Sequence, residues 1–113
     1  MAGVSITRRR VLGVLDTILP VLERQAREEN DPADHAAFRA CGALRGDIAA
    51  GEQVNLRRVR EVIEGSQGTL LNAGGISLLP SKAEKDANRA CDIADDLVDD
   101  IAEVEEQHAE QAA

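Results

Sequence analysis

Hydrophobic residues recur with the spacing of amphipathic α-helices in four segments of this chain. The segments cover about residues 6–29, 32–50, 55–73 and 81–107, and residues 108–113 are expected to fray. No run alternates apolar and polar residues in the way a strand does. The pattern predicts one all-α domain over residues 1–113, a short-looped, antiparallel four-helix bundle with a long acidic C-terminal helix.

Helix-starting residues stand before three of the segments. Asp31 is a favourable N-cap and is followed by Pro32, which suits the first helical position. Asn55 is the predicted N-cap of the third segment, and Ser81–Glu84 fits the capping box that begins the fourth. These residues place the predicted helix starts.

Glycines mark the third segment and its end. Gly65 and Gly68 predict a bend or a break inside it, and Gly74-Gly75 ends it. In the connector that follows, Leu78 and Leu79 are expected to tuck under the bundle because both side chains are large and aliphatic.

The first segment carries an unusually wide apolar arc. Its aliphatic residues fill about half of the helix circumference, which is more than the ~100° stripe that one packing contact needs. The helix is therefore either central in the bundle or shared with another subunit. Pro20 lies on its polar side and predicts a kink. The predicted self-association surface consists of Val11, Val14, Leu15, Ile18, Leu19 and Leu22.

The fourth segment has two opposite faces. One is a heptad seam whose first half is alanine, so that a neighbouring helix can approach closely. The seam consists of Ala83, Ala87, Ala90, Ala94, Leu97, Ile101 and Val104. The opposite face is acidic, and its candidate partner-docking residues are Asp92, Asp95, Asp96, Asp99, Asp100 and Glu103.

The formal net charge of −8 is concentrated in this fourth segment. Residues 1–80 carry equal numbers of acidic and basic residues, so residues 81–113 account for the whole excess. The acidic face has four interpretations: a solvated outer surface, a docking surface for a basic protein, a nucleic-acid mimic, or a divalent-cation site without EF-hand spacing. The arginines at 8–10 and at 57, 58 and 60 can pair with it inside the fold or in a second subunit.

Composition excludes several kinds of site. Apolar residues make up 43% of the chain, enough for a packed core, but Phe38 is the one aromatic residue. The composition therefore excludes sites that stack bases, sugars or flavins on several aromatic rings. The acidic surface also disfavours direct nucleic-acid binding and anionic membranes.

No catalytic pattern is present in the sequence, and we predict that the protein is not an enzyme. It has two histidines, His35 and His108, and no nucleophile elbow, P-loop or dinucleotide fingerprint. Glu105-x-x-His108 is a single copy of a motif that di-iron bundles use twice, so no metal and no cofactor are predicted. Cys41 and Cys91 are either two buried thiols or, in an oxidising compartment, a disulfide.

The N-terminal segment resembles a twin-arginine export signal over Thr7–Leu12. It departs from that pattern at Val11, at Asp16 within the apolar stretch, and in lacking a small-x-small cleavage site. The alternative is a basic first turn of an ordinary amphipathic helix. The apolar stretch is also too short to cross a bilayer, and we expect a cytoplasmic protein.

These observations favour a non-enzymatic protein–protein interaction module: an adaptor, inhibitor or assembly factor that acts through its helix faces. The expected partner is a protein, with a basic surface if the acidic helix is the docking site, and the chain itself is expected to form a homo-oligomer. The alternatives are a structural subunit of a larger assembly, such as a phage particle, and a bundle that binds a small molecule or metal in its core.

Overall fold

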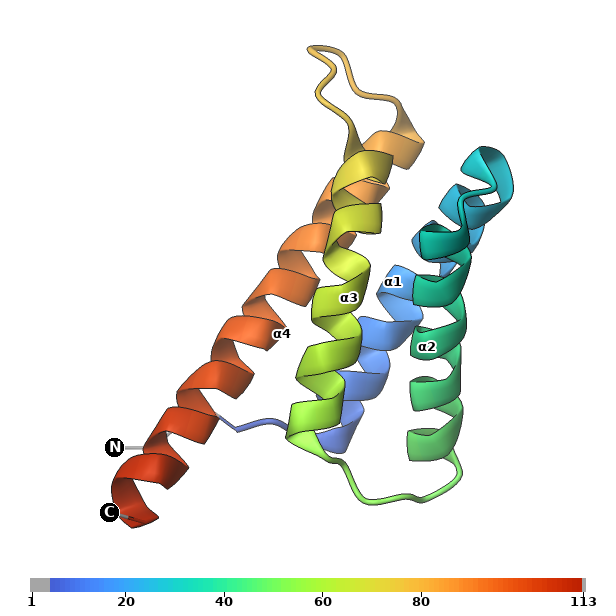
Figure 1. Cartoon of the computed structure of the whole chain (residues 1–113). Helices are drawn as coiled ribbons and strands as arrows, with labels where there is room; N and C mark the ends of the chain where they lie inside the picture. The colour runs from blue at the N-terminus through green and yellow to red at the C-terminus, as the bar shows by residue number, and fades with distance from the viewer. Residues whose placement is uncertain (1–4, 113) are drawn as a thin grey trace.

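The computed structural model describes residues 5–112, which fold into four α-helices without a strand in this range. The all-α, four-helix prediction is confirmed. In Figure 1, α1 and α3 run upwards and α2 and α4 run downwards. The helices are α1 (Arg8–Glu29), α2 (Pro32–Ala49), α3 (Leu56–Gly74) and α4 (Lys82–Ala112).

The caps form where the sequence predicts them. Asp31 Oδ1 accepts a hydrogen bond from Ala33 N at 2.8 Å, and Asn55 Oδ1 accepts one from Arg58 N at 3.1 Å. In the capping box, Glu84 N donates to Ser81 Oγ at 3.1 Å and Ser81 N donates to Glu84 Oε1 at 2.9 Å. These bonds satisfy amides that the first turn of each helix leaves free.

Two helices are more continuous than expected. α3 runs unbroken through Gly65 and Gly68, because both glycines lie on its exposed side while Ile63, Ser66 and Leu70 on the other side are buried. α4 continues to Ala112 through the segment expected to fray, and residue 113 lies outside the described residues. The extension contains alanine, glutamate and glutamine, which favour helix, and neither glycine nor proline.

The wide apolar arc of α1 is buried within the chain. α1 and α3 each pack against all three other helices. Leu19 is half-buried, and the other five residues of the predicted self-association surface are buried in the core: Val11, Val14, Leu15, Ile18 and Leu22. The central-helix alternative therefore describes this fold, and the arc is not an exposed surface for a second copy. A wide arc shows how many neighbours a helix has, but not whether they belong to the same chain.

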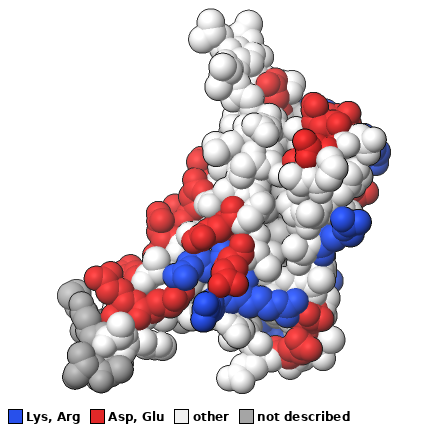
Figure 2. Space-filling model, viewed as in Figure 1, with Lys and Arg blue, Asp and Glu red and all other residues white. Residues whose placement is uncertain are grey.

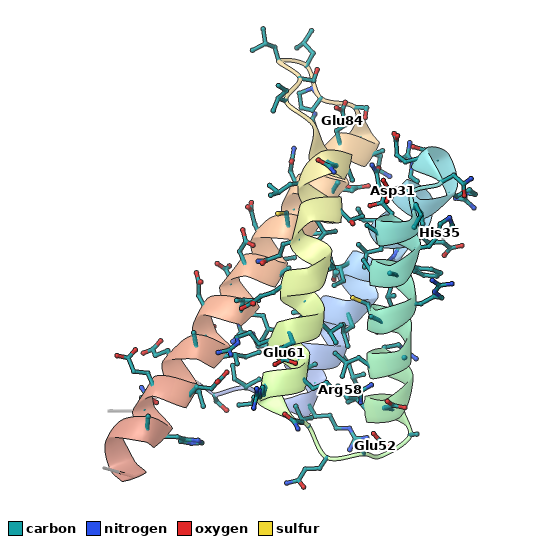
Figure 3. All side chains as sticks on the ribbon, viewed as in Figure 1. Asp31, His35, Glu52, Arg58, Glu61 and Glu84 are labelled. Atoms are coloured by element: carbon teal, nitrogen blue, oxygen red, sulfur yellow. The ribbon has the colours of Figure 1, made fainter. Side chains whose placement is uncertain are left out.

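Polar contacts join α2 and α3 at both ends of the pair. Thr69 near the end of α3 donates to Asp34 at the start of α2, with 2.8 Å between Oγ1 and Oδ1. At the other end of the same pair, Arg58 Nη2 lies 2.7 Å from Asp47 Oδ2. Figure 3 shows Arg58 and Glu52 together at this base of the bundle. α2 and α3 therefore lie side by side along their whole length.

The α4 seam packs as its residues predict. It is buried from Ala87 to Val104, and only Ala83 at its start is half-buried. At this upper end α3 lies very close, since a Cβ added to Gly74 would come within 2.0 Å of Asn88 Oδ1. The end of α3 therefore lies close to the start of α4.

Candidate functional site

Four of the six predicted docking carboxylates are exposed and lie in one line on α4. Asp92, Asp96, Asp99 and Glu103 follow each other at steps of four, three and four, and Glu106 continues the line. We call these five residues the carboxylate stripe. With a rise of 1.5 Å per residue, the stripe is about 21 Å long. Within the described residues none of the five forms an ion pair.

The other two predicted docking residues, Asp95 and Asp100, have partners inside the fold. Asp95 Oδ1 accepts a hydrogen bond from Gln67 Nε2 at 2.5 Å, and Asp100 Oδ2 lies 2.6 Å from Arg10 Nη2. Both lie at the edges of the acidic face, where a helix side chain reaches the neighbouring helix. These two carboxylates are therefore structural contacts of the bundle and not a free docking surface.

The arginine clusters also meet α4 inside the fold. Arg10 of the first cluster reaches Asp100, and Arg60 of the second reaches Glu105, whose Oε1 lies 2.9 Å from Arg60 Nη1. Figure 2 shows Lys and Arg gathered near the base of the bundle, with Asp and Glu along the lower part of α4. One arginine from each cluster therefore holds α4 against α1 or α3.

The outer face of α4 changes sign along its length. Lys82, Lys85 and Arg89 are exposed and precede the carboxylate stripe on the same face. The negative potential is therefore confined to the C-terminal half of α4.

A second exposed surface lies in the connector between α3 and α4. Ile76, Leu78 and Leu79 are 103%, 99% and 90% exposed, and we call these three residues the apolar loop. The expectation that Leu78 and Leu79 tuck under the bundle is wrong. Burying one such side chain contributes about 1.5–3 kcal/mol, so the chain leaves a large stabilisation unused here.

The ends of this connector explain why it projects, as Figure 1 shows at the top of the molecule. Gly75 has φ +61°, and a Cβ there would come within 2.7 Å of Glu84 Oε2. At the other end the capping box holds Ser81, and Figure 3 shows Glu84 at the base of the loop. With both ends fixed against α4, the few residues between them extend away from the helices.

A groove of about 550 Å³ lies between the second half of α1 and the start of α4. It exists because small side chains of α3 and α4 face α1 there and do not fill the space. The apolar lining consists of Pro20, Val21, Ala73, Ala83 and Ala87. The polar lining consists of Thr17, Arg24, Gln25, Glu28, Ser81, Glu84, Asp86 and Arg89.

A polar pocket of about 510 Å³ lies beside the buried pair Asp34 and Thr69. The sequence pattern did not lead us to predict this pair. Asp34 is 7% exposed and Thr69 is 6% exposed. A signal was present, because Asp34 extends the inner face of α2 by one step beyond Ala37 and Cys41. A carboxylate at that position needs a partner when buried, and Thr69 supplies it.

The two cysteines are buried, and neither histidine is. Cys41 and Cys91 are free and buried, and burial raises the pKa of the Cys41 thiol to about 11 and also raises the pKa of Cys91. His35 Nε2 lies 3.0 Å from Asn30 Oδ1, and His108 is exposed. Among the described residues, no three His, Cys, Asp or Glu side chains are grouped so that they could hold a metal ion.

None of the helices in the described part of the chain combines the length and apolar character that crossing a membrane requires. Comparison of the chain with protein families, curated proteins and solved structures gives no match in any of the three.

Proposed function

We propose that this chain is a non-enzymatic protein–protein interaction module that binds a basic partner through the carboxylate stripe of α4. The observation that carries the proposal is the alignment of five exposed carboxylates without an ion pair among the described residues. Neighbouring carboxylates three or four residues apart repel each other and destabilise a helix. A partner that brings cations to the stripe removes this repulsion.

The charge pattern also defines the partner surface. It is basic over about 21 Å, to match the length of the stripe. Opposite Lys82, Lys85 and Arg89 it is neutral or acidic, since like charges across an interface are costly. Such complementarity speeds association and selects the partner and its orientation.

The test compares two variants with equal changes in net charge. Asp92→Asn, Asp96→Asn and Asp99→Asn together neutralise the stripe. The control neutralises three exposed carboxylates elsewhere, through Glu23→Gln, Glu29→Gln and Glu52→Gln. A partner retained from the native host is identified, and its Kd for each chain is measured from about 50 to 500 mM salt.

We expect the stripe variant to bind at least ~10-fold more weakly at low salt, and the control to bind as the parent does. Affinity for the parent should fall steeply with salt, and the slope should be smaller for the stripe variant. An equal loss of affinity in both variants would show that binding depends only on the net charge. No loss of affinity in either variant would show that the stripe is only a solvated surface. Both results contradict the proposal.

A cytoplasmic location belongs to the same proposal, supported by two thiols that remain free. A subunit of a larger assembly is the second candidate function, and the apolar loop favours it, because large exposed aliphatic patches mark contact surfaces.

A further inference from the structure

We infer that two copies of this chain associate by exchanging their apolar loops, so that Ile76, Leu78 and Leu79 of each copy lie in the α1–α4 groove of the other. The contact uses residues distinct from the carboxylate stripe and does not depend on the function proposed for that stripe. Four observations on this one chain support it: the chemistry, size and position of loop and groove, and the surface that they bury.

The chemistry of the loop matches that of the apolar part of the groove. Residues 75–80 contain no charged side chain, so the loop can enter the groove without burying an unpaired charge. The groove offers the side chains of Pro20, Val21, Ala73, Ala83 and Ala87 as apolar contacts. Charged residues such as Arg24 and Glu28, which pair with each other at 2.9 Å, line it as well and remain beside water.

The sizes agree as well. The three aliphatic side chains of the loop contain twelve carbon atoms, which occupy about 360 Å³ if each takes the ~30 Å³ that a water molecule has in the liquid. The groove holds about 550 Å³. The three side chains therefore fit in the groove, which is open on one side.

The positions favour an exchange between two copies. Ala73 and Ser81 line the groove and also stand next to the two ends of the connector that carries the loop. Loop and groove thus lie at the same end of the bundle. A two-fold axis near this end brings each loop to the other copy's groove, and the same contact is made twice. Such an arrangement closes at two copies and leaves neither loop exposed.

The surface involved is that of a small interface. Three nearly fully exposed aliphatic side chains present an apolar surface on the order of 400 Å², close to the largest patch on a typical monomer. In the exchange each copy contributes both a loop and a groove. Together they bury less than the ~800 Å² per partner of a standard interface, so we expect a dimer that dissociates on dilution.

The first experiment removes the loop's side chains from the full chain. Leu78→Ser with Leu79→Ser is compared with Leu71→Ser, which removes a leucine that is 64% exposed on α3 but belongs to neither the loop nor the groove. Sedimentation velocity over a concentration series gives the dimer Kd. We expect a dimeric parent, a ~100-fold or greater weakening in the loop variant, and a parental Kd for Leu71→Ser.

The second experiment blocks the groove and then mixes the variants. Thr17→Arg with Ala83→Arg fills the groove from an exposed and a half-buried position and leaves the loop intact. We expect this variant to be monomeric alone. Mixed with the loop variant it should form a weaker mixed dimer, because one intact loop then meets one intact groove. Circular dichroism of each variant checks that helicity is unchanged, and Thr17→Arg alone replaces the pair if helicity falls.

Three results would overturn the inference. A parent that stays monomeric at high concentration would show that the loop serves another partner or closes on its own groove. A groove variant that dimerises as the parent does would show that loops contact loops. A mixture of two monomeric variants that gives no mixed dimer would show that loop and groove do not meet.

Discussion

The thiol of Cys41 is the side chain whose ionisation the fold changes most clearly. It is fully buried, and loss of hydration raises its pKa from 9.0 to about 11, while the nearby hydroxyl of Ser66 opposes the shift. The fold therefore holds this thiol in its protonated form at neutral pH. A protonated buried thiol is a packing residue and not a nucleophile.

This shift predicts a loss of stability at high pH. Because the folded pKa lies above the unfolded one, the contribution of Cys41 is fully present below about pH 9 and is lost as the pH rises through 11. The loss reaches about 2 kcal/mol at pH 11. Urea unfolding of the parent and of Cys41→Ala from pH 8 to 11 measures it.

Cys41→Ala should start less stable because it leaves a small cavity, but its free energy of unfolding should fall less with pH. The chain has no tyrosine and only two lysines, so few other groups titrate in this range. Parallel pH profiles for the two proteins would contradict the assignment.

At the scale of the helix, the close approach of α3 and α4 depends on Gly74. Asn88 Nδ2 lies 3.5 Å from Gly74 O, and the missing Cβ of Gly74 leaves the space that Asn88 occupies. Gly68, in the same helix, is exposed, and an added Cβ would meet nothing within 4 Å. The two glycines therefore have opposite roles.

We expect Gly74→Ala to lower the free energy of unfolding by about 1 kcal/mol, because Asn88 must move away. Gly68→Ala should raise it by about 0.5–1 kcal/mol, the difference between the two residues inside a helix. Chemical denaturation measures both. In an Asn88→Ala background the cost of Gly74→Ala should disappear. If it persists there, Asn88 is not the cause.

The sequence predicts helices better than it predicts what lies outside them. The caps at Asp31 and Asn55 and the seam of α4 follow from local spacing, which the tertiary structure does not alter. Leu78 was misplaced because hydrophobicity indicates a tendency to be buried but not the partner that buries it. Asp34 was missed because its partner Thr69 is distant in sequence, although its place on the inner face of α2 was visible.

The charge distribution of the whole molecule lowers the stability of the fold. The net charge is −8, and neighbouring carboxylates of the stripe repel each other along α4. Interhelix pairs such as Arg10–Asp100, half-buried at 2.6 Å, oppose this cost only in part, since each such pair contributes at most about 1 kcal/mol. The isolated chain is therefore less stable than its packing would allow.

Neutralising the stripe should stabilise the isolated chain, even though we expect it to weaken partner binding. Asp92→Asn, Asp96→Asn and Asp99→Asn remove several like-charge neighbours worth about 0.2–0.5 kcal/mol each, and asparagine has a helix propensity similar to that of aspartate. The free energy of unfolding should rise by about 1 kcal/mol at low salt. Asp100→Asn, a single change on the same helix, breaks the pair with Arg10 and should lower it. Urea unfolding at about 20 and 500 mM NaCl measures both effects. Each should shrink at high salt, because the Debye length then falls to about 4 Å and exposed charges farther apart than this are screened. A destabilised stripe variant would mean that these carboxylates hold the fold together, and the stripe could then no longer be regarded as a surface kept for a partner at the expense of stability.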